Sequence, residues 1–187
     1  MKEKKNNPHK VLLGVCGSIA AYKACELVHK LRYSSMEVKC VLTPSGQKFI
    51  TPLTLQTLSN NPVYTEMFVS SGPSNYDIEH ISLACWADLI VVAPATAATI
   101  ARIANGLADE LLASTIMASK APVLICPAMN TNMWNHPANR ENVKKLKSYG
   151  YEFAGPESGA LACGTEGMGR LASVDVIFKK INSILSR

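Results

Sequence analysis

The sequence has 187 residues, of which 48% are hydrophobic and 6% aromatic, and this suits one soluble domain with a sizeable core. Four lysines against one glutamate within the first ten residues account for +3 of the formal net charge of +5, so the rest of the chain is close to neutral. We therefore expect a solvated basic tail over residues 1–9. A nucleic-acid partner is not expected, because no basic stripe with interleaved aromatic residues follows.

No apolar run is long enough to cross a bilayer, and no secretory signal follows the polar N-terminus, so we expect a cytoplasmic protein with no membrane partner. The six cysteines form no C-x-x-C pair and no Cys/His cluster with the spacing of a zinc finger. The sequence therefore predicts free thiols and no metal site. Cys16, Cys40 and Cys126 lie in or beside apolar runs, where cysteine packs as a small hydrophobic residue.

The first element is a predicted strand over Lys10–Cys16, followed by the turn Gly17-Ser18-Ile19 and a helix from Ile19 to about Tyr33. Such a strand, glycine turn and helix present backbone N–H groups and a helix N-terminus to an anion. The phosphate of a mononucleotide such as FMN fits this turn as well as a dinucleotide does. A tight connection in which Gly17 only provides space is an equally good interpretation.

A second strand is predicted over Glu37–Thr43, with short helices from Gln47 and over Pro52–Asn61. Ser45, between them, is either a helix N-cap or a hydroxyl group that faces a ligand, and the cap is the favoured interpretation. Residues 69–75 are predicted to form a polar surface loop.

A helix that carries His80 precedes a central strand over Asp88–Ala93. Small residues then lead into a helix over Ile100–Ala104, and after a break at residues 105–106 another helix runs to about Ser119. The small residues let a planar ligand approach the backbone closely, although plain packing of helix on sheet explains them too. His80 stands just upstream of the central strand, where it could face the same site.

The run Pro122–Cys126 is typical of a buried parallel strand, and the octet Pro127–Trp134 follows its carboxyl end. Ligands of open α/β sheets bind at that end of the strands. The amide of Asn130 offers donors and an acceptor that could orient a carboxylate. The alternative for each residue is structural, with the methionines and the tryptophan packed and the asparagines in turn hydrogen bonds.

The C-terminal third is predicted to contain a helix over Ala138–Tyr149, a short strand over Tyr151–Ala154 and a final helix over residues 173–185. Between the last two elements, five glycines within residues 155–170 predict a mobile lid, about residues 156–170, instead of a packed element. Cys163 lies in this segment, and a cysteine in a closing lid can act as a proton donor or nucleophile.

The alternation of strands and helices predicts a single-domain α/β fold over residues 10–187, with a doubly wound, mostly parallel sheet of the flavodoxin or Rossmann-like type.

Four segments together resemble the flavin-dependent cysteine decarboxylases: GSIAAYK at the first turn, EHISLA with His80, PAMNTNMW and ACGTEGMGR. The last two patterns are specific, and the resemblance covers about residues 10–185. It implies FMN-dependent decarboxylation of 4′-phosphopantothenoylcysteine to 4′-phosphopantetheine in coenzyme A biosynthesis. In many bacteria this domain is fused to a synthetase, and we expect the chain to represent the decarboxylase part.

The resemblance also implies a set of functional residues and an assembly. His80, Asn130 and Cys163 would be catalytic, and the family often has asparagine in place of Ala98. A homotrimer or dodecamer would hold the flavin site between subunits. The implied FMN-binding residues are Gly17, Ser18, Ile19, Thr43, Ser45, Thr96, Ala97, Ala98, Thr99 and Ala128. The implied substrate-binding residues are Met129, Asn130, Ala162 and Cys163.

Three alternative functions belong to relatives of this family. They are decarboxylation of a peptidyl cysteine in peptide antibiotic maturation, flavin prenyl transfer, and non-catalytic regulation by an FMN-binding protein. The specific octet and the lid cysteine argue against the prenyltransferase. The absence of an acidic tail and the joint presence of His80, Asn130 and Cys163 argue for catalysis.

Overall fold

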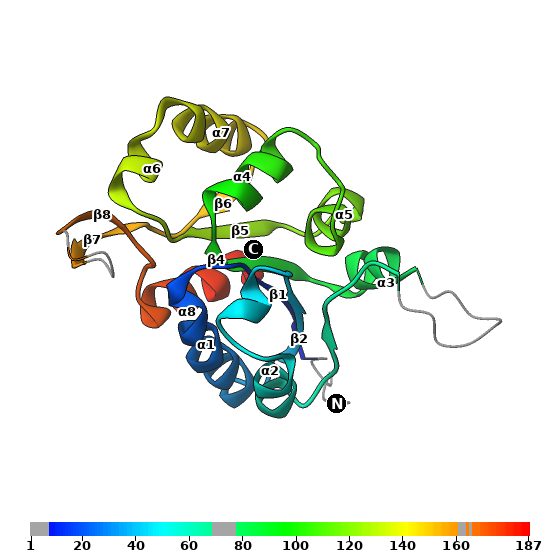
Figure 1. Cartoon of the computed structure of the whole chain (residues 1–187). Coiled ribbons are helices and arrows are strands. Elements are labelled where there is room, and N and C mark those ends of the chain that lie inside the picture. Colours follow the sequence, from blue (N-terminus) through cyan, green and yellow to red (C-terminus); the bar gives the residue numbers. More distant parts are fainter. Residues whose placement is uncertain (1–7, 69–77, 161–163, 165) are drawn as a thin grey trace.

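A computed structural model of the chain describes residues 8–68, 78–160, 164 and 166–187. Its main sheet has six parallel strands in the order β3-β2-β1-β4-β5-β6 (Figure 1). The bounds are Lys10–Val15 for β1, Glu37–Leu42 for β2, Val63–Tyr64 for β3, Leu89–Ala95 for β4, Val123–Pro127 for β5 and Glu152–Phe153 for β6. The predicted doubly wound α/β fold is confirmed.

Helices cover both faces of this sheet (Figure 1). One face carries α1 (Tyr22–Tyr33), α2 (Pro52–Ser59) and α8 (Val174–Leu185). The other carries α3 (Glu79–Trp86), α4 (Ala97–Ala104), α5 (Leu111–Ala118) and α7 (Pro137–Ser148). Two short 3₁₀ helices, η1 (Ile19–Ala21) and η2 (Gly46–Lys48), follow the first two strands, and the short helix α6 (Thr131–Asn135) follows β5. None of the described helices is long and apolar enough to span a membrane.

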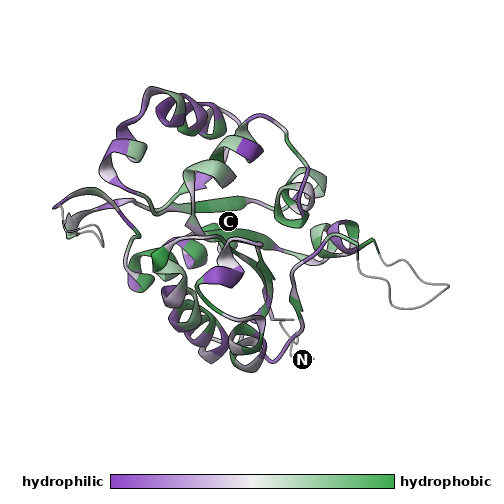
Figure 2. Ribbon diagram, in the orientation of Figure 1, coloured by the Kyte–Doolittle hydropathy of each residue, from purple (hydrophilic) through white to green (hydrophobic). Residues whose placement is uncertain are grey.

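The central strands are buried on both faces, which explains their nearly continuous apolar sequences. Alternate residues of β1 and β4 enter opposite cores. Leu13 and Val91 join the core under α1 and α8, whereas Leu12 and Ile90 join the core under α4 and α5. Figure 2 shows this hydrophobic centre between two layers of helices whose outer faces are more polar.

The strand order reverses direction between β1 and β4, and this places the functional end of the sheet. The chain leaves β1 toward α1 on one face and leaves β4 toward α4 on the other. The two connections therefore diverge at the carboxyl ends of neighbouring strands, where ligands bind in open α/β sheets. A hydrogen bond of 3.2 Å from the backbone N–H of Cys16 to the carbonyl of Pro94 joins the two strand ends.

The glycine-rich segment differs from its prediction. The described residues form an antiparallel hairpin of β7 (Glu157–Ala160) and β8 (Glu166–Arg170), so the prediction that these glycines exclude a packed element was wrong. A Cβ atom at Gly169 would lie 2.2 Å from the carbonyl oxygen of Met129, and the carbonyl of Gly169 accepts a 3.0 Å bond from the N–H of Met129. Glycine is required there because the two backbones touch. The mobility of the lid stays a prediction.

Other boundaries moved by a few residues. The helix expected after residues 105–106 begins at Leu111, and the octet contains α6, which periodicity did not predict because it has only five residues. The predicted polar loop at residues 69–75 and most of the predicted basic tail lie outside the described residues.

Candidate functional site

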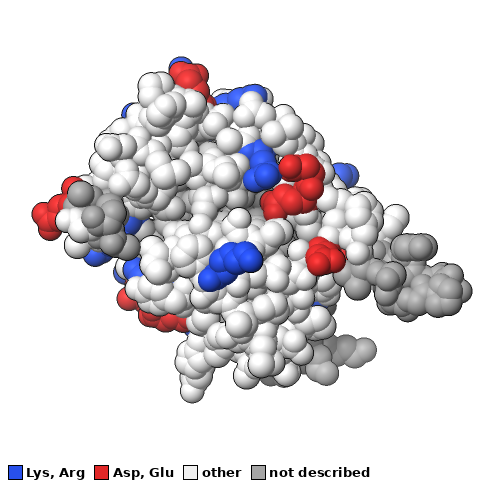
Figure 3. All heavy atoms as spheres, viewed as in Figure 1, with Lys and Arg blue, Asp and Glu red and all other residues white. Residues whose placement is uncertain are grey.

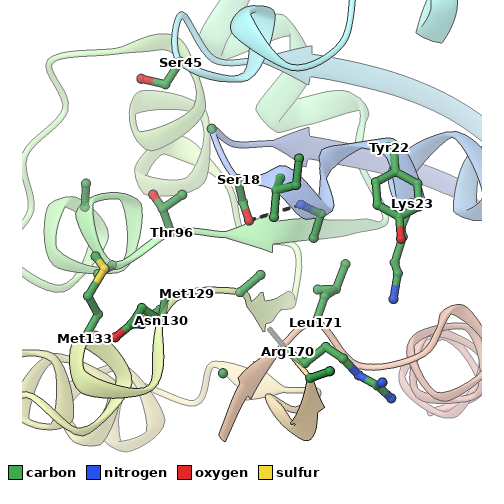
Figure 4. A pocket seen from close by; sticks show the side chains of 18 residues that line it. Ser18, Tyr22, Lys23, Ser45, Thr96, Met129, Asn130, Met133, Arg170 and Leu171 are labelled. Carbon is green, nitrogen blue, oxygen red and sulfur yellow. Dashed lines mark hydrogen bonds between the residues drawn. The ribbon is translucent and has the colours of Figure 1, made fainter. Parts of the chain in front are cut away.

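A cavity of about 580 Å³ opens at the carboxyl ends of β1, β4 and β5 (Figure 4). Each of these strands contributes the turn that follows it, and the hairpin closes one side. The lining residues are Gly17, Ser18, Ile19, Ala20, Tyr22, Lys23, Ser45, Thr96, Ala97, Ala98, Ala128, Met129, Asn130, Met133, Ala160, Gly169, Arg170 and Leu171. Most of the predicted cofactor-binding residues therefore come together in one place.

The turn after β1 is shaped to receive an anion. Ser18 caps η1, and its hydroxyl oxygen accepts a 3.3 Å hydrogen bond from the N–H of Ala20. η1 continues directly into α1, so the partial positive charge of a long helical run points at the cavity. A Cβ atom at Gly17 would lie 2.4 Å from the Cβ of Ser45, which shows how closely this turn approaches the turn after β2.

The turn after β4 presents Thr96 to the cavity, and hydrogen bonds to Thr99 hold Thr96 in place. Thr96 caps α4, and its Oγ1 accepts a 3.3 Å bond from the N–H of Thr99. The hydroxyl of Thr99 lies 3.1 Å from that of Thr96 and donates to the Sγ of Cys16 at 3.3 Å. Thr99 is buried and does not line the cavity. Thr99 lies behind the residues that line the cavity, where its hydrogen bonds stabilise the turn after β4.

Thr43 is also buried behind the cavity. Its hydroxyl donates to the carbonyl of Val15 at 3.3 Å and accepts from the N–H of Gly46 at 3.2 Å. It therefore fixes the loop that carries Ser45, whereas Ser45 itself lines the cavity and makes no side-chain cap of η2. Ser45 thus occupies the N-cap position of η2, as expected, but its hydroxyl makes no cap hydrogen bond.

The octet after β5 places Asn130 at one end of the cavity, beside Met129 and Met133 (Figure 4). Asn130 caps α6, and its Oδ1 accepts a 2.8 Å bond from the N–H of Asn132. This bond fixes the orientation of the amide. The amide oxygen serves the cap, and Nδ2 carries the only donor hydrogens of this side chain, so a carboxylate would be held through Nδ2.

Two cationic side chains that the sequence interpretation did not select also line the cavity. Lys23 stands on the first turn of α1 and Arg170 ends β8. Both belong to segments that carry the family resemblance, GSIAAYK and ACGTEGMGR. Their positive charge was a signal available in the sequence, but only the fold brings β8 next to the first helix.

His80 does not line the cavity of its own chain. It lies on α3, which packs against α5 at the opposite end of the molecule from the hairpin (Figure 1). Its Nδ1 atom is buried and has no hydrogen-bond partner among the described residues. The predicted Ala162 and Cys163 lie outside the described residues, although the preceding Ala160 lines the cavity.

The ionisable groups beneath the site are shifted by burial. Burial raises the pKa of the Cys16 thiol to about 12, so it is protonated at neutral pH and is no nucleophile. Burial also raises the pKa of Glu110, which occupies the N-cap position of α5 without a side-chain cap hydrogen bond, although the nearby Arg102 acts in the opposite direction. Within residues 8–68, 78–160, 164 and 166–187, no group of three or more His, Cys, Asp or Glu residues could hold a metal ion.

These features define a flavin-binding α/β protein, and the chain belongs to the Flavoprotein family, whose pattern it matches over residues 1–186. It is similar to a probable phosphopantothenoylcysteine decarboxylase of Streptococcus mutans, with 44% identity over 94% of this chain and 98% of the relative. A solved structure of a PPC decarboxylase mutant complexed with pantothenoylaminoethenethiol has a TM-score of 0.86 and 32% identity, and covers 96% of this chain and 100% of its own.

A longer relative is the coenzyme A biosynthesis bifunctional protein CoaBC of Bacillus subtilis, with 49% identity over 92% of this chain and 42% of the relative. The chain thus spans less than half the length of the bifunctional relatives that it matches.

The cavity fits a flavin on its own geometry. The space at Gly17 that a Cβ would fill, the cap at Ser18 and the helix N-terminus suit a phosphate, because they combine close backbone approach with donors. Ala97, Ala98 and Ala128 line the cavity with methyl groups only, which leaves room for a flat ring. An asparagine in place of Ala98 would add an amide to this wall.

Proposed function

We propose that this chain binds FMN and decarboxylates 4′-phosphopantothenoylcysteine to 4′-phosphopantetheine. The observation that carries the proposal is that the glycine turn after β1 and Asn130 line the same cavity. The turn, residues 17–19, is the proposed phosphate cradle, and a hydrogen bond orients the amide of Asn130. The relatives support the same activity, since one of nearly equal length is named for it.

The chemistry requires an electron sink, because direct loss of carbon dioxide from a cysteine unit would leave an unstabilised carbanion. Bound FMN supplies reversible hydride transfer to and from the substrate carbon next to sulfur. Gly17, Ser18 and Ser45 hold the phosphate of the cofactor, and the Nδ2 of Asn130 holds the carboxylate that departs. The Cys163 thiol would give a proton to the carbon that has lost carbon dioxide. No net oxidation occurs, because the hydride removed before decarboxylation would return to the same substrate carbon afterwards.

We also propose that the active site is shared between copies of the chain in a homotrimer or dodecamer, with His80 supplied by a neighbour. The distance of α3 from the cavity of its own chain supports this arrangement. Exposed apolar side chains that could contact a neighbouring subunit lie at the start of α3, on α3 and on the adjacent α5. They are Ile78, Ile81 and Met117, which are 59%, 46% and 52% exposed. Charged side chains are sparse on the face seen in Figure 3.

The first test is an absorbance spectrum of the purified protein, followed by incubation with 4′-phosphopantothenoylcysteine and mass analysis. A yellow protein that releases 4′-phosphopantetheine supports the proposal. A yellow protein that is inert to this substrate but decarboxylates a peptide with a C-terminal cysteine, or prenylates its flavin, would replace it. A colourless protein that added FMN cannot reconstitute would overturn the cofactor assignment.

Sharing of the site is tested by complementation. His80→Asn and Asn130→Asp subunits are each expected to be inactive, whereas their co-expression should restore activity, because some sites then combine His80 from one copy with Asn130 from another. Absence of restored activity in mixed oligomers would show that both residues act within one chain.

A further inference from the structure

Arg170 is held in a fixed position at the cavity by the hairpin. Its Nη2 lies 3.4 Å from the Oε2 of Glu157 on the paired strand. The other oxygen of Glu157 accepts a 3.1 Å bond from the N–H of Ser173, which caps α8. The guanidinium group also packs over Gly159, where a Cβ atom would lie 3.1 Å from Nη1. The hairpin and the start of α8 thus jointly orient this side chain.

Arg170 keeps donors to spare. A guanidinium group has five N–H donors, and in the described part of the chain only Nη2 makes a hydrogen bond. The side chains of the pair are 47% and 31% exposed, so the ion pair itself is weak and serves mainly to orient the arginine.

Lys23 is the second cation of the cavity. It is half-buried, and no hydrogen bond or ion pair joins its ammonium group to any other described residue. A cation that lines a cavity without a protein counter-ion attracts an anionic ligand, so this position favours a bound anion. The described lining residues include no aspartate or glutamate that could supply the counter-charge.

Figure 4 shows Lys23 and Arg170 at the end of the cavity away from Asn130 and Met133. The cavity is therefore polarised, with an amide donor at one end and two cations at the other. A substrate with a carboxylate at one end and a phosphate at the other matches this polarity. The proposed function places the flavin phosphate at the turn of Gly17 and Ser18, which leaves the two cations for a second anionic group.

We propose that Arg170 and Lys23 form the subsite that binds the phosphate monoester of the substrate, with Glu157 as the residue that positions Arg170. This inference rests on the proposed function and assigns its substrate specificity: the phosphorylated substrate is selected over its dephosphorylated counterpart. Arginine suits the role because its planar fork binds two phosphate oxygens at once.

The test compares steady-state kinetics on 4′-phosphopantothenoylcysteine and pantothenoylcysteine. Arg170→Gln and Lys23→Gln should each raise KM for the phosphorylated substrate by about 10- to 100-fold, the effect of losing a charge-assisted hydrogen bond. KM for the dephosphorylated substrate and kcat for both should stay unchanged. Glu157→Gln should give a smaller rise of the same kind, and Arg170→Lys should recover part of the loss. Arg140→Gln, an exposed arginine on α7 outside the cavity, is the matched control.

Measurements of flavin binding distinguish whether the subsite holds the phosphate of the substrate or the phosphate of FMN. The affinities of the variants for FMN and riboflavin, measured by quenching of flavin fluorescence, should equal those of the wild type. A selective loss of FMN affinity would assign the two cations to the cofactor phosphate and overturn the inference. Equal losses on both substrates would also overturn it, because they would show a structural role.

A wild-type protein that turns over neither substrate would instead refute the proposed function. The subsite is then tested by calorimetry with 4′-phosphopantetheine and pantetheine. Tighter binding of the phosphorylated compound that is lost in Arg170→Gln supports the subsite, and equal binding of the two compounds overturns it.

Discussion

Gly17 and Ser45, which both line the cavity, approach each other so closely that no side chain fits between them. A Cβ atom at Gly17 would lie 2.4 Å from the Cβ of Ser45, 2.9 Å from its carbonyl carbon and 3.0 Å from its carbonyl oxygen. The contact joins the turns that follow two neighbouring strands, so the shape of the proposed phosphate cradle depends on the absence of a side chain at one residue.

Substitution of Gly17 by alanine should therefore weaken flavin binding by at least tenfold, because the two turns must separate. Titration of the apoprotein with FMN, followed by fluorescence, measures this. The double variant Gly17→Ala/Ser45→Gly should recover only part of the affinity, since it removes the nearest of the three contacts and leaves both backbone contacts. Unchanged FMN affinity in the single variant would place the phosphate elsewhere.

Asn130→Asp separates the structural role of this residue from its proposed role with substrate. Aspartate retains the oxygen that caps α6, so the melting temperature and flavin content should stay close to those of the wild type. Decarboxylation should fall by at least 100-fold, because the substituted carboxylate repels the substrate carboxylate and cannot donate to it. Asn130→Ala is the comparison variant and should lose about 1 kcal/mol of stability along with activity. An active Asn130→Asp protein would contradict the assignment.

The buried thiols should resist alkylation in the native protein. Burial raises the pKa of Cys16 and of Cys40 to about 12 and also raises the pKa of Cys126. Thiolate is the reactive form, so iodoacetamide at pH 8 should modify these residues at least 100-fold more slowly than in the denatured chain. Peptide mapping by mass spectrometry gives the rate at each site. If Cys16 reacts as fast in the native protein as in denaturant, the segment around Cys16 must open in the native state.

Glu110 should lower stability at neutral pH. Its Oε1 is buried without a hydrogen-bond partner among the described residues, and burial raises its pKa above the ordinary 4.5. The folded state then holds this proton more tightly than the unfolded state, so stability falls as pH rises from 4.5 through the raised pKa and stays lower above it.

Glu110→Gln cannot ionise, and at pH 7.5 it should melt roughly 1–3 °C above the wild type, with the difference shrinking toward pH 4. Differential scanning calorimetry across this range measures the effect. Glu26→Gln, at an exposed position on α1, controls for loss of a negative charge. A melting difference that does not depend on pH would contradict the assignment.

Glu152 should affect the pH dependence of stability in the opposite direction to Glu110, because its pKa is lowered instead of raised. Hydrogen bonds from Lys180, at 2.8 Å, and from Arg187, at 2.7 Å, hold its pKa below 4.5. Its contribution is therefore present above pH 4.5 and is lost as pH falls through the lowered pKa. Glu152→Gln should cost about 0.5–1 kcal/mol at pH 7 and low salt, less at high salt, and almost nothing near pH 2. Urea denaturation at these conditions provides the comparison.

The secondary structure was largely predictable because the central strands are buried on both faces. Such strands must be apolar over their buried length, as Val11–Cys16 and Leu89–Ala93 are, and most of the helices between them carry one apolar stripe. The turns at Gly17 and Thr96 line one cavity, as expected for turns at the carboxyl ends of parallel strands, which meet at one edge. The hairpin was not predictable, because Gly169 and Gly167 are explained by close approach to Met129 and Thr131, which are distant in sequence.

By itself, the sequence determined which segments form strands, helices and turns, because strand and helix periodicity and local turn chemistry depend on neighbours along the chain. Only the tertiary structure decided which side chains share the cavity. It set Thr43 and Thr99 behind the wall, placed His80 away from the site of its own chain and brought Arg170 to the same end as Lys23. These relationships depend on strand order and on the docking of the hairpin, which arise from contacts between residues far apart in the sequence.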